Sequence, residues 1–262
     1  MPKLQTLLDH YIDSSLHVAT AVVALVFVTA NQFQSTLDYS IYGTVFFATV
    51  VGYNTIKFGN LDGKKKRFFF NQYSLLTYSF AGLFFLSSLF FPVQQQLILV
   101  CVSLMVFFYA FPIYSGGKNI RNRKKVKIYW VAFVWSLFTV IFPVSDVFLE
   151  GKGLAVLAHR FVFVFCATLP FEIRDLATDP NSLRTWPQRF GVWKTRILGI
   201  LLVVIASLFL FCWSVEDQIV TLVIHLLLAG CILGADTKQS KYYASFFVES
   251  IPLLWALLGV LI

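Results

Sequence analysis

The stretch PFEIRDLATDP places three carboxylates close together in a chain that is otherwise rich in Phe, Leu and Val. Glu172, Asp175 and Asp179 follow one another at spacings of three and four, so on a helix they share one face, and Arg174 points elsewhere. A rise of about 1.5 Å per residue puts Asp175 and Asp179 about 6 Å apart along the axis, near enough to ligate one hard cation. Pro180 disfavours helical geometry at Asp179, so we expect the helix to end there.

Basic side chains follow these acids and could bind phosphate oxygens. Acids and bases together fit a cation–diphosphate site, because Mg²⁺ is commonly held by one or two carboxylates and substrate phosphates. The alternative is a solvated loop whose acids offset its arginines. We favour the site because Glu172 directly follows an apolar run, where ionisable groups are costly and usually functional. The basic residues are Arg184, Arg189, Lys194 and Arg196.

The elements that position these groups are predicted to be membrane helices. Of the 262 residues 58% are hydrophobic and only 13% are charged, which excludes a soluble globular domain of this length. Apolar runs of about 17 to 25 residues can span a bilayer. The sequence therefore predicts an all-α polytopic membrane protein with nine transmembrane helices. The expected spans are 16–30, 40–56, 72–91, 95–114, 128–145, 154–171, 196–214, 219–235 and 244–262.

The net charge of +8 would suit a nucleic-acid partner, but the placement of the charges argues against one. Nearly all of the 21 Lys and Arg residues fall in the amino terminus or in the second, fourth, sixth and eighth connections, and the exceptions are Lys152 and Arg160. This asymmetry predicts an integral membrane protein, expected in a bacterial inner membrane, with its amino terminus and these connections in the cytoplasm. The remaining electrostatic partners are membrane lipid headgroups or an anionic substrate.

The chain is expected to form one transmembrane domain over residues 1–262. Its polar connections after the second and sixth helices lie four helices apart. Helices one to four and five to eight are therefore candidates for two related halves, with the ninth helix added, and sites in such folds lie where the repeats meet. The amino terminus lacks a small-residue cleavage site and is interpreted as a mature amphipathic segment. The four Cys residues lie in apolar runs without CxxC pairing, which favours packing roles over disulfides or zinc.

The residues after the sixth helix resemble the second aspartate motif of the UbiA-type intramembrane prenyltransferase superfamily. That motif is DxxxD followed by Lys/Arg-Thr-x-Pro-x-x-x-Gly. The resemblance implies a bundle of nine helices around a central, lipid-open cavity with a cytoplasmic cap. It also implies Mg²⁺-dependent ionisation of an allylic diphosphate, with Asp175 and Asp179 as catalytic metal ligands and Glu172 as a further ligand. The matching residues are Asp175, Asp179, Arg184, Thr185, Pro187 and Gly191.

The first aspartate motif of that family, NDxxDxxxD, is degenerate here. In NTIKFGNLD its first two acids are replaced by Thr55 and Phe58, and only Asp62 remains as a candidate metal ligand. Asn54 is retained as a candidate diphosphate ligand. Lys57 stands among these positions and is interpreted as a catalytic cation that supplies to the diphosphate part of the charge of a missing metal. The alternative is that Lys57 is only a positive-inside residue.

The connection after the fourth helix carries further candidate ligands for a diphosphate. Tyr114 and Lys118 resemble the YxxxK contact of the family, and Tyr109 lies deeper without a Lys partner. Arg121 and Lys127 are equally suited to phosphate oxygens. Arg184 completes the expected diphosphate-binding set.

Four polar residues lie within the predicted spans. His225 is interpreted as a packing residue with a satisfied hydrogen bond, and Glu249 as a candidate for the mouth of the cavity. His159 and Arg160 lie toward the outer end of the sixth helix, where we expect them to snorkel toward the interface.

Three functions remain open from the sequence. The leading hypothesis is a membrane-embedded enzyme that transfers the prenyl group of an isoprenyl diphosphate to a lipophilic or aromatic acceptor. The second is a terpene cyclase, which makes a cyclic terpene without an acceptor. The third is a non-catalytic relative that binds prenyl lipids, which the missing acids at Thr55 and Phe58 favour.

Overall fold

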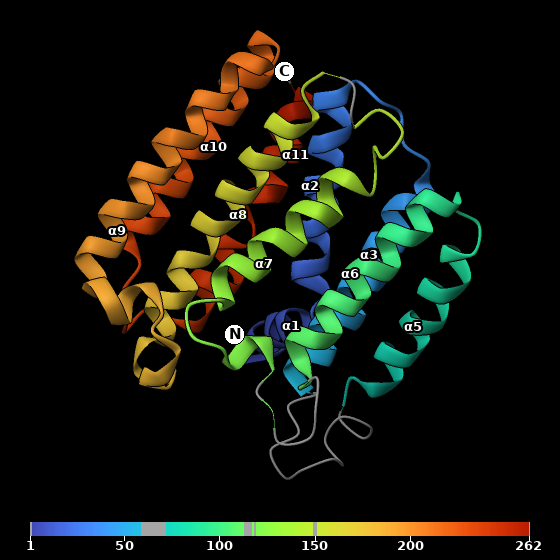
Figure 1. Ribbon diagram of the computed structural model, residues 1–262. Coiled ribbons are helices and arrows are strands. Elements are labelled where there is room, and N and C mark those ends of the chain that lie inside the picture. The colour runs from blue at the N-terminus through green and yellow to red at the C-terminus, as the bar shows by residue number, and fades with distance from the viewer. Residues whose placement is uncertain (1, 59–71, 113–116, 118, 149–150, 262) are drawn as a thin grey trace.

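The computed structural model describes residues 2–58, 72–112, 117, 119–148 and 151–261, and this part of the chain is all-α (Figure 1). The candidate residues Asp62, Tyr114 and Lys118 lie outside the described residues. The α-helices are α1 (Pro2–Asp13), α2 (Leu16–Phe33), α3 (Tyr39–Phe58), α5 (Ser74–Ser88), α6 (Val93–Ala110), α7 (Lys127–Ser136), α8 (Gly153–Arg174), α9 (Trp186–Ser207), α10 (Val215–Gly234) and α11 (Ile251–Leu261). The short helices are η1 (Ile120–Asn122), η2 (Leu137–Ile141), η3 (Asp175–Ala177), η4 (Asn181–Leu183), η5 (Leu208–Cys212) and η6 (Tyr243–Val248).

Every predicted span coincides with a helix, which confirms the all-α class, but the count of nine spans is not confirmed. Six helical segments of the described chain are long and apolar enough to cross a membrane. Helix α5 and the segment from α7 through η2 are apolar but shorter. Helix α3 has 20 residues, yet it is not among the six, since its Tyr, Thr, Asn and Lys residues lower its hydropathy. The six segments are 16–33, 93–110, 153–177, 186–210, 217–234 and 243–261.

Helices α2, α3, α6, α7 and α8 and the η6–α11 segment form a ring in which each packs against the next, with η6 packing against α8 and α11 against α2. Helix α5 covers α3 from outside, while α9 and α10 pack against α8 and α11 on the opposite flank (Figure 1). The outer surfaces of α9 and α10 are apolar and exposed, including Leu201, Val204, Leu222 and Leu226. Such surfaces suit a lipid environment, which is as apolar as the side chains themselves.

Two buried clusters hold the ring together. One joins α2, α7 and α8 to α9, α10 and α11 through residues such as Phe163, Leu169 and Ile232. The other joins α2, α3, α6 and η2 through residues such as Val26 and Val102. The space between the two clusters is where the cavity described below lies.

Helix α1 is amphipathic and lies across the end of the bundle beside the first turns of α2 (Figure 1). Its Asp9 forms an ion pair with Lys241 and accepts a 2.8 Å hydrogen bond from the Tyr242 hydroxyl. The hydrogen bond from Lys241, followed by that from Tyr242, lowers the pKa of Asp9 below its ordinary value. These contacts attach α1 to the segment that precedes η6.

The expectation that Arg160 and His159 snorkel is wrong, because both side chains are fully buried. Arg160 donates to the Leu25 carbonyl at 2.9 Å and to the Thr29 hydroxyl at 3.2 Å, so it joins α8 to α2. His159 lies 3.0 Å from His225 between their Nε2 atoms. The interpretation of His225 as a packing residue with a satisfied bond is confirmed, since its Nδ1 also lies 2.8 Å from the Ser207 hydroxyl.

Candidate active site

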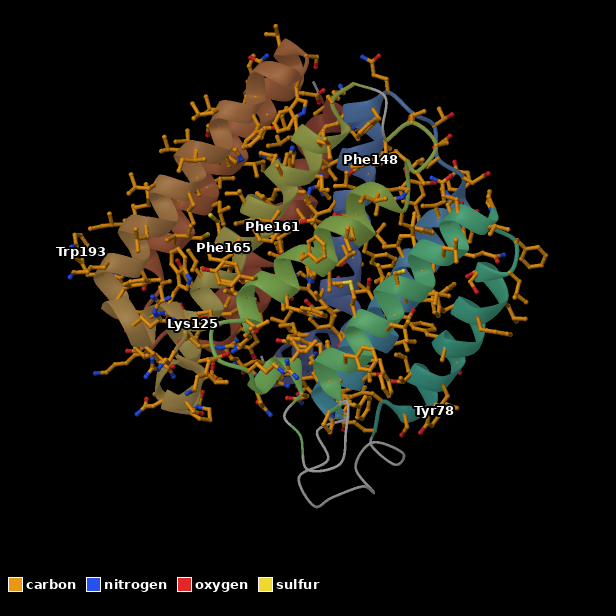
Figure 2. The ribbon with its side chains drawn as sticks, in the orientation of Figure 1. Tyr78, Lys125, Phe148, Phe161, Phe165 and Trp193 are labelled. Atoms are coloured by element: carbon orange, nitrogen blue, oxygen red, sulfur yellow. The ribbon has the colours of Figure 1, made fainter. Side chains whose placement is uncertain are left out.

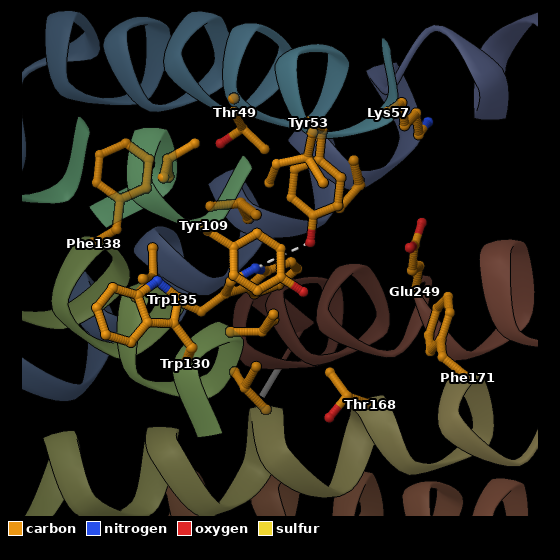
Figure 3. A pocket seen from close by; sticks show the side chains of 18 of the residues that line it. Thr49, Tyr53, Lys57, Tyr109, Trp130, Trp135, Phe138, Thr168, Phe171 and Glu249 are labelled. Carbon is orange, nitrogen blue, oxygen red and sulfur yellow. Dashed lines mark hydrogen bonds between the residues drawn. The ribbon is translucent and has the colours of Figure 1, made fainter. Parts of the chain in front are cut away.

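A cavity of about 720 Å³ lies inside the ring, lined by α2, α3, α6, α7, α8 and the η6–α11 segment. Its body is apolar and aromatic, with walls that include Val22, Trp130 and Phe138. Its other end is polar. Figure 3 shows Lys57 and Glu249 at that end, and Trp130 and Phe138 toward the other. One continuous cavity thus joins an apolar compartment to a charged one. The charged residues that line it are Lys57, Arg121, Lys127, Glu172, Arg174, Asp175 and Glu249.

The three acids of the motif come together, but not on a continuous helix. The prediction that the helix extends to Asp179 is wrong, because α8 ends at Arg174 and Asp175 begins the 3-10 turn η3. The Asp179 N–H donates to the Asp175 carbonyl at 2.8 Å, so one further helical turn follows α8 before Pro180. Asp179 thereby stays beside Asp175, and all three acids form ion pairs with Lys127. These three residues are called the carboxylate cluster below.

Lys127, the first residue of α7, stands at the centre of the carboxylate cluster. Its Nζ lies 2.7 Å from Asp179 Oδ2, 3.8 Å from Glu172 Oε1 and 3.9 Å from Asp175 Oδ2. Glu172 is only 3% exposed, and neither of its carboxylate oxygens has a well-aligned hydrogen bond among the described residues. A buried carboxylate needs a compensating cation. Lys127 supplies that charge. It also lines the cavity, so it lies between the acids and the cavity interior.

Arg174 also takes part, contrary to the expectation that it points away from the acids. Its Nε donates to Asp175 Oδ1 at 2.8 Å, and its Nη1 donates to the Ser245 hydroxyl at 2.9 Å. The helical spacing predicted that Arg174 and Asp175 point in different directions. Since α8 ends at Arg174 and Asp175 begins η3, that spacing does not apply to this pair. The guanidinium therefore links the carboxylate cluster to η6.

The tail of the motif has a structural explanation. Thr185 is the N-cap of α9, where its N–H donates to the Gln188 side chain at 3.0 Å, and Pro187 falls in the first turn. Gln188 Nε2 in turn donates to the carbonyls of Asp179 and Pro180 at 3.1 and 3.2 Å. Gly191 adopts φ 75°, a conformation that strongly favours glycine. The start of α9 thereby fixes the position of Asp179.

Lys57 and Glu249 line the polar end from elements other than α8. Lys57 donates to the backbone carbonyls of Ile12 and Asp13 at 3.1 and 3.2 Å, at the end of α1. Glu249 follows the π-helix η6, a type of irregularity that is frequent at functional sites. Glu249 lines the same cavity as the cations Lys57 and Arg174. The interpretation of Glu249 as a residue of the cavity is supported by this placement.

The other predicted diphosphate ligands are divided between the cavity and the surface. Arg121 lines the cavity and donates to the Ile56 carbonyl at 3.3 Å. Arg184 is exposed and lines a small separate hollow beside Lys127 and Glu172. The basic residues that follow the acids were predicted to form a phosphate-binding cluster, but the structure does not bring them together at the cavity. Arg189 lies over the Phe190 ring and Arg196 binds the Ala235 carbonyl.

Asn54 is placed as a packing residue, so the interpretation of its side chain as a diphosphate ligand needs correction. It is 1% exposed and is not part of the cavity wall. Its Oδ1 accepts from Ser15 at 2.8 Å and its Nδ2 donates to Thr77 at 2.9 Å, which joins α2, α3 and α5. The neighbouring Tyr53 faces the cavity instead and accepts a 3.1 Å hydrogen bond from Trp135 (Figure 3). Sequence reasoning missed this Tyr–Trp pair, because nothing in the local pattern separates cavity aromatics from packed ones.

The carboxylate cluster has the ligand chemistry for a hard divalent cation, and the buried Glu172 oxygens lack well-aligned hydrogen bonds. Among the described residues, however, no group of three or more His, Cys, Asp or Glu is ready to hold a metal ion. The position where the carboxylates converge is held by the Lys127 ammonium. The acids are therefore oxygen donors of the kind that Mg²⁺ takes, and in this structure they compensate the charge of Lys127.

Comparison with solved structures identifies the fold. A UbiA homologue from Archaeoglobus fulgidus bound to GPP and Mg²⁺ matches with a TM-score of 0.63 and 14% identity, over 93% of this chain and 95% of that one. A structure from work on digeranylgeranylglyceryl phosphate synthase in membranes matches with a TM-score of 0.57 and 14% identity, over the whole of both chains. The chain has the UbiA fold. The predicted resemblance is thereby confirmed at the level of the fold, whereas no family model and no curated protein matches the sequence.

In this UbiA fold the described charged groups of the cavity are contributed by α3, η1, α7, α8, η3 and the η6–α11 segment. Figure 2 shows Lys125, which precedes α7, at the same end of the bundle as the amino terminus, while Phe148 lies at the opposite end. The polar end thus lies at the end of the bundle that carries the described basic residues before α7.

Proposed function

We propose that this protein is a membrane-embedded prenyltransferase that uses an allylic isoprenyl diphosphate and transfers the prenyl group to a lipophilic acceptor. The observation that carries the proposal is the division of the cavity into an apolar body and a charged end. An isoprenyl diphosphate has the same division, with a hydrocarbon chain at one end and a strongly anionic group at the other. The UbiA homologue of the same fold is bound to GPP and Mg²⁺.

The residues of this chain have distinct roles in the proposed reaction. The apolar walls bind the prenyl chain and exclude water, which strengthens every electrostatic interaction in the cavity. Lys57 and Arg121 face the diphosphate. Their positive charges stabilise the negative charge that develops on this leaving group when the allylic C–O bond breaks. The acceptor captures the allylic carbon and loses a proton.

Asp175 and Asp179 are the residues that we propose hold Mg²⁺, with Glu172 and, outside the described residues, Asp62 as further candidate ligands. When bound, Mg²⁺ would supply positive charge to the diphosphate leaving group. The DxxxD spacing, the converging carboxylates and the Mg²⁺ bound to the homologue support this assignment. The polar end is proposed to face the cytoplasm, from the asymmetry of Lys and Arg.

Terpene cyclisation is the second candidate, and the aromatic walls of the cavity favour it. Tyr53, Tyr109, Trp130, Trp135 and Phe138 line one space, and aromatic faces stabilise cations by about 0.5–2 kcal/mol each. In that reaction the carbocation is captured by a double bond of its own chain. Neither an acceptor nor a site for one would be needed.

One experiment separates the candidates. Purified protein in nanodiscs is incubated with allylic diphosphates of increasing chain length, with and without Mg²⁺ and with and without a lipid extract as a source of acceptors. Pyrophosphate release that requires the extract, with a prenylated lipid product, is the result expected for transfer. Release with a hydrocarbon product in the absence of extract would indicate cyclisation. Tight binding without any release would indicate a prenyl-lipid-binding relative.

A further inference from the structure

Lys127 differs from the other cations of the polar end in the kind of partner that holds it. Lys57 donates to the carbonyls of Ile12 and Asp13, and Arg121 donates to a backbone carbonyl as well. Arg174 is shared between Asp175 and a hydroxyl. Within the described part of the chain, the Lys127 ammonium contacts carboxylates alone. It therefore occupies the place that a metal ion would take.

Lys127 is within hydrogen-bond distance of one of the three acids and farther from the other two. Only Asp179 is at hydrogen-bond distance, at 2.7 Å, while Glu172 and Asp175 are 3.8 and 3.9 Å away. The buried Glu172 has no well-aligned hydrogen bond among the described residues, and the backbone N–H of Trp186 is the donor that acts on its carboxylate. A divalent cation at about 2.0–2.1 Å from its oxygen ligands would satisfy these carboxylates more closely.

An ammonium and a divalent cation cannot share this position. Two like charges about 4 Å apart in a poorly solvated site repel one another strongly. Lys127 has a flexible four-carbon stem and lines both the main cavity and the small hollow beside Arg184. Its ammonium can therefore leave the carboxylates and still remain at the polar end, where the proposed diphosphate would lie.

We propose that the Lys127 ammonium and a divalent cation compete for the carboxylate cluster. In this arrangement Lys127 sets the metal affinity of the site and turns to the diphosphate when a metal takes its place. The competition stands on the geometry alone, whereas the identity of the anion rests on the proposed function. When the divalent cation replaces the Lys127 ammonium, the negative charge of the carboxylate cluster stays balanced. The ammonium then becomes a second positive charge beside the diphosphate.

The test measures Mn²⁺ binding by electron paramagnetic resonance, with protein in nanodiscs of neutral lipid and no diphosphate present. Lys127→Met removes the charge and keeps most of the side-chain volume, so Mn²⁺ should bind at least about tenfold more tightly than to the unaltered protein. Lys127→Arg keeps the charge and should show no such gain. Lys124→Met is the matched control, because Lys124 is exposed and the net charge changes equally. Its Mn²⁺ affinity should stay unchanged.

A second measurement follows the ammonium after the exchange. At saturating Mn²⁺, inorganic pyrophosphate should bind about tenfold or more weakly to Lys127→Met than to Lys124→Met. Equal or weaker Mn²⁺ binding by folded Lys127→Met would overturn the competition and leave Lys127 as a brace of η3. Unchanged pyrophosphate affinity would overturn the transfer of Lys127 to the anion. Failure of all variants to release pyrophosphate from GPP would instead count against the proposed reaction, since neither binding measurement depends on it.

Discussion

The three acids of the polar end differ in how the structure constrains them. Asp175 and Asp179 are placed by a helix end and by the capped start of α9, and both are partly exposed. Glu172 is buried within the last turn of α8. We therefore expect the two aspartates to be the adaptable ligands and Glu172 the fixed one.

Asp175→Ala and Asp179→Ala should each abolish Mg²⁺-dependent binding of an allylic diphosphate while the protein remains folded. The physical reason is that each change removes a proposed ligand and leaves the diphosphate charge less compensated. Binding is measured by calorimetry with and without Mg²⁺, and folding by circular dichroism. Asp217→Ala, on an exposed first turn at the other end of the bundle, is the control. Normal Mg²⁺-dependent binding in both variants would return these acids to the solvated-loop interpretation.

Lys57→Ala should weaken diphosphate binding about 10- to 100-fold, because a partly desolvated ammonium–phosphate contact contributes about 1.5 to 3 kcal/mol. The change also removes the hydrogen bonds of Lys57 to the end of α1. Asp9→Asn serves as the control, since it loosens α1 from Lys241 without removing charge from the cavity. If the two variants bind diphosphate equally well, Lys57 contributes through topology and α1 packing rather than through its charge.

At the element scale, the close approach of α8, α9 and α10 sets one wall of the protein. A Cβ on Gly199 would lie 2.6 Å from Leu169 Cδ1 and 3.1 Å from Ile232 Cγ2. A Cβ on Gly230 in α10 would have no other atom within 4 Å. The two glycines therefore separate a packing requirement from helix propensity.

Gly199→Ala should destabilise the protein by about 1–3 kcal/mol, the usual cost of overpacking a core. Gly230→Ala should be neutral or stabilising by up to about 1 kcal/mol, since alanine is the better helix former. Apparent melting temperatures of both variants in the same detergent provide the comparison. A lower melting temperature for Gly230→Ala than for Gly199→Ala would contradict the packing of α9 against α8 and α10.

The attachment of α1 should depend on pH through Asp9, whose pKa is lowered chiefly by its hydrogen bond from Lys241. A carboxyl with a lowered folded-state pKa stabilises above its unfolded pKa, and this contribution is lost as pH falls through the folded pKa. A spin label at Gln5 should thus show constant mobility from about pH 7 to 5 and greater mobility below the ordinary pKa of 3.8. In Asp9→Asn the label should be mobile throughout, and a label that stays immobile there would show that α1 is held by other contacts.

At the scale of the whole molecule, the polar end of the cavity, α1 and the basic connections share one end of the bundle. Lys152 and Arg160 are the exceptions among the Lys and Arg residues, and the burial of Arg160 against Leu25 and Thr29 removes it from the topology argument. The distribution of Lys and Arg then predicts that this end faces the cytoplasm.

Single cysteines at Asn122 and Ser182, both exposed, should resist a membrane-impermeant thiol reagent in intact cells and react after membrane disruption. A cysteine at the exposed Asp146, near the opposite end, should react in intact cells. The native cysteines are first replaced so that only the introduced thiol is labelled. Labelling of the Asn122 or Ser182 site in intact cells would contradict the proposed orientation.

The membrane class, the helical segments, the location of the acidic motif and the resemblance to the UbiA superfamily were all predictable from the amino-acid sequence. These features are local or compositional, since an apolar run, a DxxxD spacing and a Thr-x-Pro cap are each complete within a short stretch. The end of α8 at Arg174 was misplaced by a few residues, because the chain that follows η3 is held at the Asp179 carbonyl by Gln188 in the first turn of α9.

The cations that contact the acids, and the polar residues that are buried, become evident from the packing of the helices in three dimensions. Lys127 reaches Asp179 across 52 residues of sequence, and Asn54 is turned away from the cavity by Ser15 and Thr77. In a soluble protein the polar face of a helix would indicate how it is rotated. In a bilayer the lipid-facing and core-facing surfaces are both apolar, so rotation is left to side-chain packing between helices that are distant in the sequence.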